Sequence, residues 1–192
     1  PAKYNEVLAE LVGTGAEGIE MVATMLQPAK EGVRNSAIEY AIYGAAAYVT
    51  KDTAMRGAVR QGLKNAFAKI SDKPNKAFIM TALEVCATAE DAEWFAAQLG
   101  DEYLGNFAAR TLATMKGSEK VVLNLMKADK APRIHLAHIA SYKQIPEAEN
   151  ILIHWLAEGA DDALKCQIYN ALVSCGSSQS VKILEKASAA SD

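Results

Sequence analysis

The most regular feature of this sequence is the spacing of its apolar residues, which recur every three or four positions along most of the chain. The segments 101–115 and 148–156 show this spacing clearly, and it is the period of a helix with one buried face. Strict alternation of apolar and polar residues over four or more positions, the mark of a half-buried strand, is hard to find. Alanine is abundant and β-branched runs are short, which also favours helix. The pattern therefore predicts an all-α fold.

Proline, serine and glycine mark where these helices should begin and end. Pro74 and Pro146 suit the first turn of a helix, where no backbone N–H is needed. Ser118 stands before Glu119 and a run of apolar residues, as an N-cap would. Glycines stand where helices should stop, at 100, 117, 159 and 176. In the first half of the chain the pattern predicts two helical hairpins, with helices at 16–27 and 33–51 and at 54–71 and 75–88.

Four segments of the second half begin alike, and this is the strongest signal in the sequence. They start at residues 89, 118, 146 and 177, so the starts are 28 to 31 residues apart. Each of the first three is followed by a second helical segment rich in alanine. Six positions before each start stands a small or aliphatic residue, as a seam between packed helices requires: Leu83, Leu112, Ala140 and Ala171. One helical hairpin cannot bury its apolar face alone, so such repeats stack into arrays.

A period near 30 with two helices per repeat resembles the HEAT-like repeat family, and this short-period form is similar to the HEAT-like repeats of the phycobilisome-lyase type. The resemblance covers 89–187 well and 16–88 loosely. Of the Asp and Arg pair usual in the second-helix region, Arg110 is present in one repeat. The resemblance implies a right-handed superhelical α-solenoid of about five helical hairpins, the last one partial. We expect a single domain over 1–192, with looser hairpins at 1–88, regular repeats at 89–187 and a tail or linker at 188–192.

Composition and charge narrow the classes of function. Apolar residues make up 51% and charged residues 22%, which is ordinary for a folded domain. The net charge is −3 and the pI about 5.7, whereas a domain that neutralises phosphates usually has a basic excess, so nucleic acid is not the expected partner. No apolar run is long enough to span a membrane. The three cysteines are widely spaced and are expected to be buried, reduced thiols.

Motifs for a cofactor, a metal or a catalytic nucleophile are weak. Gly13, Gly15 and Gly18 form a GxGxxG pattern, but no βαβ pattern surrounds it, so we expect a turn between two helices instead of a dinucleotide site. His135 and His138 have metal-ligand spacing but lack a third ligand on their predicted helix. We therefore expect no cofactor, no metal and no enzymatic activity.

The larger aromatic residues also have an expected place. Trp94 and Trp155 occupy first-helix positions in two repeats and are expected to pack in the core or between repeats. Tyr40, Tyr43 and Tyr48 flank a run of three alanines that allows close helix approach. These tyrosines are expected at the edge of the stack, with their hydroxyls in water.

The repeat register selects candidate binding residues on the second helices, which line the concave face of such a solenoid. Stepping one repeat at a time from Arg110 leads to His138 and then to Tyr169, and Asn106 and Tyr142 lie on nearby turns of the same helices. Arginine and tyrosine are enriched at binding hot spots, and histidine hydrogen-bonds flexibly. The hypothesis is that Arg110, His138 and Tyr169 form an exposed ladder, and the alternative is an ordinary solvated helix face.

These features predict a non-catalytic binding or scaffolding module that holds a protein or peptide. One alternative is an accessory or spacer domain of a larger secreted or periplasmic protein, beside a carbohydrate-active module, because the chain starts at Pro1 without a Met and ends in a Ser/Ala-rich segment. Another is an enzyme, since some solenoids resembling this one are DNA glycosylases or chromophore lyases. Salt-dependent DNA binding would distinguish the glycosylase. The sequence leaves the compartment and the oligomeric state open.

Overall fold

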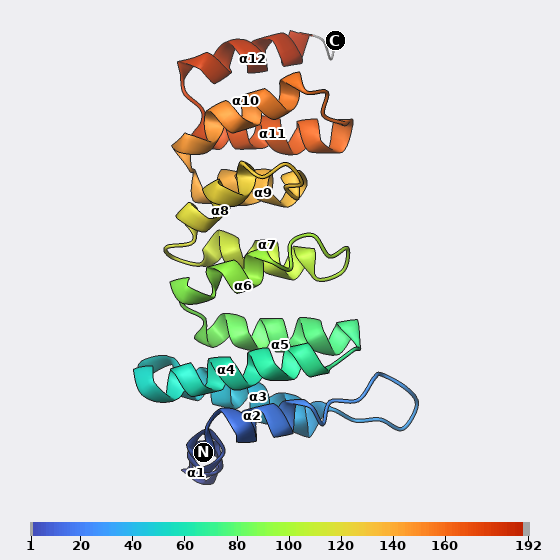
Figure 1. Cartoon of the computed structure of the whole chain (residues 1–192), viewed down its shortest axis with the longest axis vertical. Helices are drawn as coiled ribbons and strands as arrows, with labels where there is room; N and C mark the ends of the chain where they lie inside the picture. Colours follow the sequence, from blue (N-terminus) through green and yellow to red (C-terminus); the bar gives the residue numbers. More distant parts are fainter. Residues whose placement is uncertain (1, 190–192) are drawn as a thin grey trace. The chain divides into compact units, whose positions relative to one another are not determined.

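The structure, a computed structural model, describes residues 2–189 and contains twelve α-helices, three short 3-10 turns and no strand in that range (Figure 1). The all-α prediction is confirmed for this part of the chain. No helix in it is both long and apolar enough to cross a membrane. The chain divides into two compact units, Pro1–Ala87 (unit 1) and Thr88–Asp192 (unit 2). The boundary falls beside residue 88, where the looser predicted hairpins give way to the regular repeats.

Unit 1 contains five helices, and the longer ones begin with a capping aspartate. Asp52 accepts hydrogen bonds from the backbone of Ala54 and Met55, and Asp72 accepts one from the backbone of Asn75. These bonds satisfy N–H groups that have no partner within the helix. The predicted helix boundaries agree with the structure to within four residues. The helices are α1 (Ala2–Gly13), α2 (Gly15–Ala23), α3 (Ser36–Tyr48, extended by the 3-10 turn Val49–Lys51), α4 (Thr53–Lys69) and α5 (Lys73–Cys86).

The glycine-rich stretch near the N-terminus is a turn between two helices, as predicted. Helix α1 ends at Gly13, and α2 begins at Gly15, whose φ is +73°. This left-handed backbone favours glycine because a side chain would be strained there. The glycines therefore redirect the chain.

Helices α2 and α4 pack closely because one glycine lies between them. A Cβ atom added to Gly62 of α4 would lie 2.5 Å from the carbonyl oxygen of Ala16 and 2.8 Å from Cβ of Ile19. Beside this contact the carboxylate of Glu20 accepts hydrogen bonds from Asn65, at 3.0 Å, and from Lys69. These bonds hold the pKa of Glu20 below its ordinary value, the Lys69 bond contributing most. The polar contacts flank the close approach and fix how the two helices cross.

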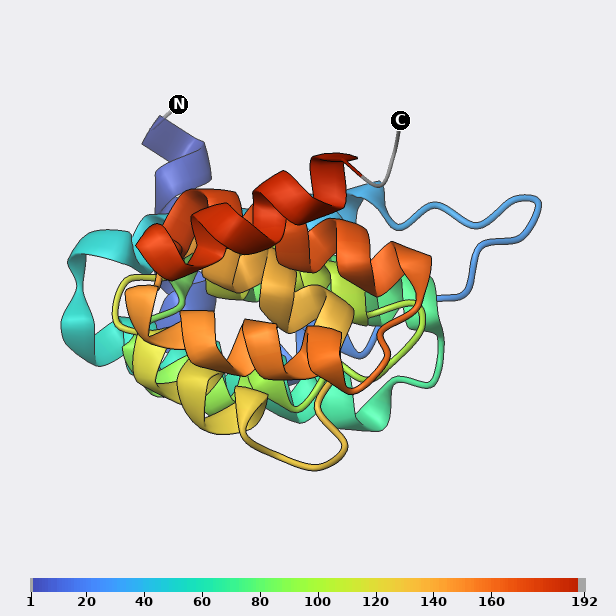
Figure 2. The same ribbon diagram turned by 90° about the horizontal axis from the view of Figure 1, so that it is seen from above.

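The connection between α2 and α3 extends away from the helices of unit 1 as an open loop, drawn in blue in Figures 1 and 2. Asn35 closes its base, since its amide oxygen accepts from the backbone of Gln27 at 3.1 Å and its amide nitrogen donates to the Gln27 carbonyl at 2.8 Å. Gly32 has a φ of +81° within the loop. Sequence periodicity predicted a helix from residue 33, and the structure begins α3 at Ser36 because Asn35 is used to close the loop.

Unit 2 is built from hairpins whose first helices are short. Two of the first helices are preceded by a 3-10 turn of three residues. The elements are the 3-10 turn Ala89–Asp91 with α6 (Ala92–Ala96), α7 (Gly105–Thr114), α8 (Glu119–Met126), α9 (Arg133–Lys143), the 3-10 turn Pro146–Ala148 with α10 (Glu149–Ala157), α11 (Asp162–Cys175) and α12 (Ser178–Ala189).

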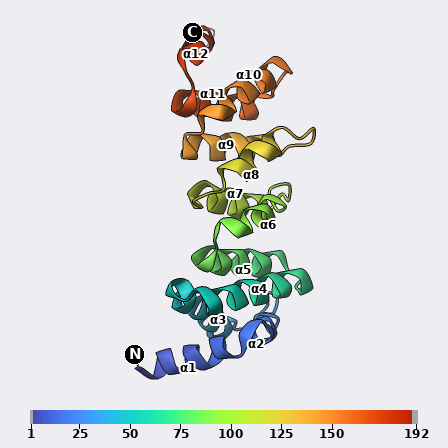
Figure 3. The same ribbon diagram turned by 60° about the vertical axis from the view of Figure 1, so that its left-hand side comes forward.

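The helices of unit 2 form two layers. The first helices α6, α8 and α10 lie on one side, and the second helices α7, α9 and α11 lie on the other (Figure 3). Helix α9 packs against both α7 and α11. The predicted seam positions of this unit, Leu112, Ala140 and Ala171, are all fully buried. Trp155 is also buried, as predicted, whereas Trp94 is half-buried.

Three expectations for unit 2 need correction. The helix predicted from Asp101 begins only at Gly105, because Oδ1 of Asp101 accepts from the backbone of Tyr103 and Leu104 and forms a turn there. The tail predicted from residue 188 is wrong for 188 and 189, which belong to α12, and 190–192 lie outside the described residues. Cys166 is exposed, although the other two cysteines are buried as predicted and all three are free thiols.

Candidate functional site

Four of the five predicted binding residues lie exposed on neighbouring second helices of unit 2. Asn106 and Arg110 are exposed on α7, one helical turn apart. His138 and Tyr142 are exposed on α9 with the same spacing, and Tyr142 is 62% exposed. Helices α7 and α9 pack against each other, and Arg110 and His138 each stand two residues after an equivalent buried residue, Ala108 and Leu136.

Tyr169, the fifth predicted residue, lies elsewhere. It is half-buried on α11 and lines a cavity of about 620 Å³ together with side chains of α10 and α12, among them Leu156 and Ile183. The structure therefore does not group Tyr169 with Arg110 and His138.

The buried residues of the second helices explain this difference. Two sets recur at matching positions on α7, α9 and α11: Ala108, Leu136 and Ile168, and Leu112, Ala140 and Leu172. Leu172 lies 32 residues after Ala140, whereas the repeat starts are 31 residues apart. One residue turns a helix position by about 100°. The exposed position that continues the row from Arg110 and His138 is therefore Asn170.

We call the exposed set Asn106, Arg110, His138, Tyr142 and Asn170 the ladder face. Two serines join its second and third helices. Oγ of Ser141 on α9 lies 3.0 Å from Oγ of Ser174 on α11 and donates to the Asn170 carbonyl at 3.4 Å. Asn170 could have been found in the sequence by aligning the buried residues of the second helices instead of the starts of the first helices.

His135 and His138 have different surroundings despite their spacing. His135 is half-buried, and a Cβ added to Gly105 would lie 2.8 Å from its Nε2 atom. Burial, and to a lesser extent the charge of His138, lower the pKa of His135. Across residues 2–189 no group of three or more His, Cys, Asp or Glu side chains is placed to hold a metal ion.

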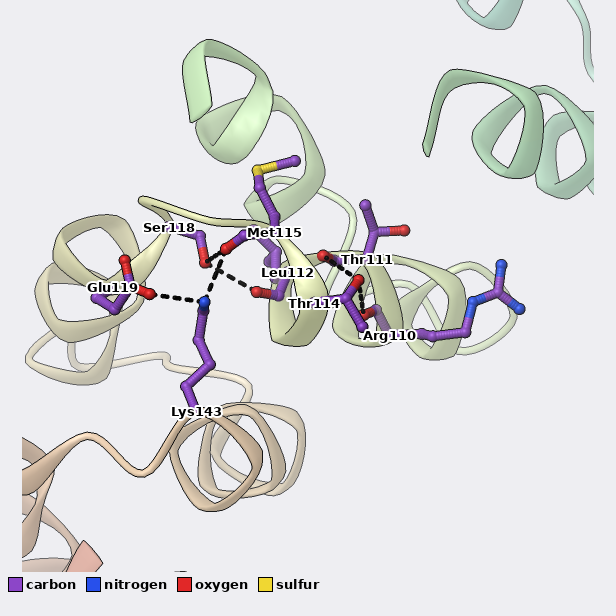
Figure 4. A network of polar contacts seen from close by, with 8 residues as sticks. All are labelled: Arg110, Thr111, Leu112, Thr114, Met115, Ser118, Glu119 and Lys143. Atoms are coloured by element: carbon purple, nitrogen blue, oxygen red, sulfur yellow. Dashed lines mark hydrogen bonds and ion pairs between the residues drawn. The ribbon is translucent and has the colours of Figure 1, made fainter. Parts of the chain in front are cut away.

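A buried lysine holds together the ends of three helices, α7, α8 and α9 (Figure 4). The ammonium group of Lys143 donates to the Met115 carbonyl and to the Glu119 carboxylate, each at 2.7 Å, and its side chain is 7% exposed. Oγ of Ser118, the predicted N-cap, donates to the carbonyls of Leu112 at 2.8 Å and Met115 at 3.1 Å. Ser118 does precede α8, but its hydroxyl donates to carbonyls at the end of α7 and makes no capping hydrogen bond to α8.

This cluster joins the end of α7 to the start of α8 and the end of α9. The Lys143 hydrogen bond holds the pKa of Glu119 below its ordinary value, so the carboxylate stays charged opposite the ammonium group. Arg110 extends away from the cluster in Figure 4. Its guanidinium lies 5.7 Å from the centre of the Phe107 ring, one turn earlier on α7.

Glu149 plays a comparable part for the last helix, and replacing it with alanine is expected to loosen α12. Oε1 of Glu149 accepts from the Ser177 backbone at 2.7 Å, the Ser177 hydroxyl at 2.9 Å and the Ser180 hydroxyl at 2.5 Å. These bonds, above all the one from Ser180, lower the pKa of Glu149. Their stabilisation is therefore present above the ordinary glutamate pKa and is lost as the pH falls through the lowered value.

Amide hydrogen exchange of residues 178–189 measures this effect. At neutral pH we expect these amides to exchange faster in Glu149→Ala than in the parent chain. In the parent chain itself, we expect their exchange, relative to the intrinsic rate, to become faster below a pH of about 4. The exposed neighbour Glu147, replaced with alanine, is the control. Equal protection of α12 in both variants would show that Glu149 does not hold this helix.

A pocket between α10, the start of α9 and the loop after α8 has charged side chains around Trp155. Its volume is about 370 Å³, and the loop after α8 forms one wall. The guanidinium of Arg133 lies 5.2 Å from the Trp155 ring centre and 2.6 Å from a carboxylate oxygen of Glu158. Nε2 of His154 lies 3.3 Å from the other oxygen of Glu158. Arg133, His154 and Glu158 are thus paired with one another, which suits a structural role.

A second exposed pocket, in unit 1, is aromatic. Side chains from α3 and α5 line a volume of about 350 Å³: Ser36, Glu39, Tyr40, Tyr43 and Phe78. Tyr40 is 72% and Tyr43 46% exposed. The tyrosines were expected at an edge with their hydroxyls in water, but the contribution of Phe78 was missed because it depends on how α3 and α5 pack.

Comparisons of the whole chain with models of known protein families, with curated proteins and with solved structures found no significant match.

Proposed function

We propose that this chain is a non-catalytic binding module that holds a protein or peptide across its second helices, and that its hairpins form a HEAT-like, right-handed α-solenoid. Two features of unit 2 support the solenoid. Its helices alternate between two layers, and its seam residues recur with the repeat. An array of this kind offers an extended surface to which each repeat contributes equivalent positions.

The observation that carries the binding proposal is the composition of the ladder face. Arg110, His138 and Asn170 occupy equivalent exposed positions on the second helices α7, α9 and α11, and Tyr142 is 62% exposed. Arginine and tyrosine are the residue types that most often anchor protein interfaces.

The spacing of these side chains suits a partner that runs across the helices. Packed helices lie about 8–10 Å apart, and an extended peptide advances about 3.3 Å per residue. Such a peptide would meet a new helix roughly every third residue. Arg110 offers donors for a carboxylate or carbonyl, and His138 and Asn170 offer both donors and acceptors.

The test is capture of a partner from a lysate of the source organism. We expect the ladder variant to capture at least about tenfold less of the partner than the parent chain does. Truncating one anchor residue at such an interface typically costs about 1–2 kcal/mol or more of binding free energy. The control variant changes an exposed lysine, histidine and valine elsewhere in unit 2 and should hold the partner as well as the parent chain does. The three baits are the parent, the ladder variant R110A/H138A/Y142A and the control variant K120A/H154A/V181A.

Circular dichroism must first give the same helix content for all three baits. A partner lost by the control variant and kept by the ladder variant would place binding on another surface. If the three baits capture the same proteins in equal amounts, the ladder face is a solvated surface, and the spacer alternative is then the better account of this chain.

A further inference from the structure

The aromatic pocket between α3 and α5 has a chemical character of its own. Three aromatic rings and one carboxylate line it, with the Ser36 hydroxyl at its edge, and its lining contains no lysine or arginine. Aromatic rings are negative on their faces, and a carboxylate beside them adds a full negative charge. This combination attracts organic cations.

The groups of this pocket are available to a ligand. Within residues 2–189 the Glu39 carboxylate makes no hydrogen bond or ion pair, and the rings of Tyr40, Tyr43 and Phe78 do not stack on one another. The Tyr4 hydroxyl donates to the backbone carbonyl of Tyr40 at 3.3 Å, which fixes α3 at this point. Tyr40 and Tyr43 are 72% and 46% exposed on this supported helix, so a ligand can reach both side chains.

We propose that this pocket binds the guanidinium group of an arginine side chain carried by a partner polypeptide. A planar guanidinium stacks on an aromatic face and forms two parallel hydrogen bonds with a carboxylate, whereas an ammonium group does neither as well. The negative pocket thus complements a positive partner segment. This site lies in unit 1 and the ladder face in unit 2, so either proposal can fail without the other.

The test uses a small probe, so that it does not depend on finding the natural partner. Acetyl-Gly-Arg-Gly-amide is titrated into the isotopically labelled full chain and followed by NMR. The matched probe carries citrulline, which has the shape of arginine without its charge. We expect the arginine peptide to shift Glu39, Tyr40, Tyr43 and Phe78 and to saturate in the millimolar range, and the citrulline peptide to bind several-fold more weakly.

Variants of the pocket and its surroundings sharpen the result. Glu39→Gln and Tyr40→Ala should each weaken the arginine peptide by about threefold or more, and Tyr40→Trp should retain binding because tryptophan is the best cation–π partner. Glu31→Gln removes a charge outside the pocket, and Tyr48→Ala removes an exposed tyrosine of the same unit, 42% exposed. Both controls should leave the affinity unchanged.

Equal binding of the arginine and citrulline peptides would overturn the proposal, since it would show that the pocket does not select charge. So would an arginine peptide that causes no saturable shift at these residues, or a loss on Tyr48→Ala as large as that on Tyr40→Ala. All these positions are exposed or half-buried, and matching amide spectra of each free variant will show that the fold is retained.

Discussion

Replacing Gly62 with alanine is expected to lower the free energy of unfolding by about 1–2 kcal/mol, even though alanine is the better helix former. The new methyl group would lie 2.5 Å from the carbonyl oxygen of Ala16, and a backbone atom cannot rotate away as a side chain can. Helices α2 and α4 would have to move apart, which also stretches the contacts of Glu20 with Asn65 and Lys69. Urea unfolding followed by far-ultraviolet circular dichroism measures the change.

The same helix supplies the control. A Cβ added to Gly57 of α4 meets nothing within 4 Å, so Gly57→Ala should raise the free energy of unfolding by about 0.5–1 kcal/mol through helix propensity alone. The two substitutions are chemically identical and should differ in sign. If Gly62→Ala stabilises the chain as Gly57→Ala does, then α2 and α4 do not approach as closely as described.

The helices of this protein could be predicted from sequence because local signals agree with one another there. Asp52 and Asp72 cap helices that the apolar spacing also places, and Pro74 lies in the first turn of α5. Where a side chain competes with the helix, the prediction was wrong, as at Asp101, whose carboxylate forms a turn instead. Gly57 and Gly62 look alike in the sequence, since only the approach of α2 distinguishes them.

The candidate sites were harder to predict, because a binding face depends on helix rotation. An error of one residue in the register was enough to select Tyr169, which faces α10 and α12, in place of Asn170. The aromatic pocket depends on Phe78, which lies in α5, beside tyrosines of α3 that are 35 or more residues earlier in the chain. The spacing of residues within one helix cannot predict a contact between residues so far apart in the sequence.

Both units use a buried or half-buried cation to close the end of a second helix. In unit 1 the guanidinium of Arg56 donates to the carbonyls of Cys86 and Ala87, each at 2.7 Å. In unit 2 the ammonium group of Lys143 donates to the carbonyl of Met115, the C-cap of α7. The last carbonyls of a helix have no partner within it and carry partial negative charge, so a cation satisfies them and interacts favourably with the helix dipole.

Lys143→Met is therefore expected to lower the free energy of unfolding by about 2 kcal/mol, the usual cost of removing a charged hydrogen-bond partner from a mostly buried site. Methionine keeps the apolar stem but leaves the Met115 carbonyl without its ammonium donor. Lys120→Met is the control, because Lys120 is exposed on α8 next to Glu119. Unfolding in urea should show a large loss for the first variant and a change within about 0.5 kcal/mol for the second.

The pH dependence of the same variants separates the ion pair from simple packing. In the parent chain Lys143 lowers the pKa of Glu119, so the unfolded chain takes up a proton first, and the stability falls as the pH drops below the ordinary glutamate pKa. In Lys143→Met the part of this loss of stability that comes from Glu119 should disappear. The free energies of unfolding of the parent and of Lys143→Met should therefore converge as the pH falls. Parallel curves over this range would mean that Lys143 acts through its hydrogen bond to the Met115 carbonyl, and that its charged contact with Glu119 contributes nothing to holding α8 and α9 together.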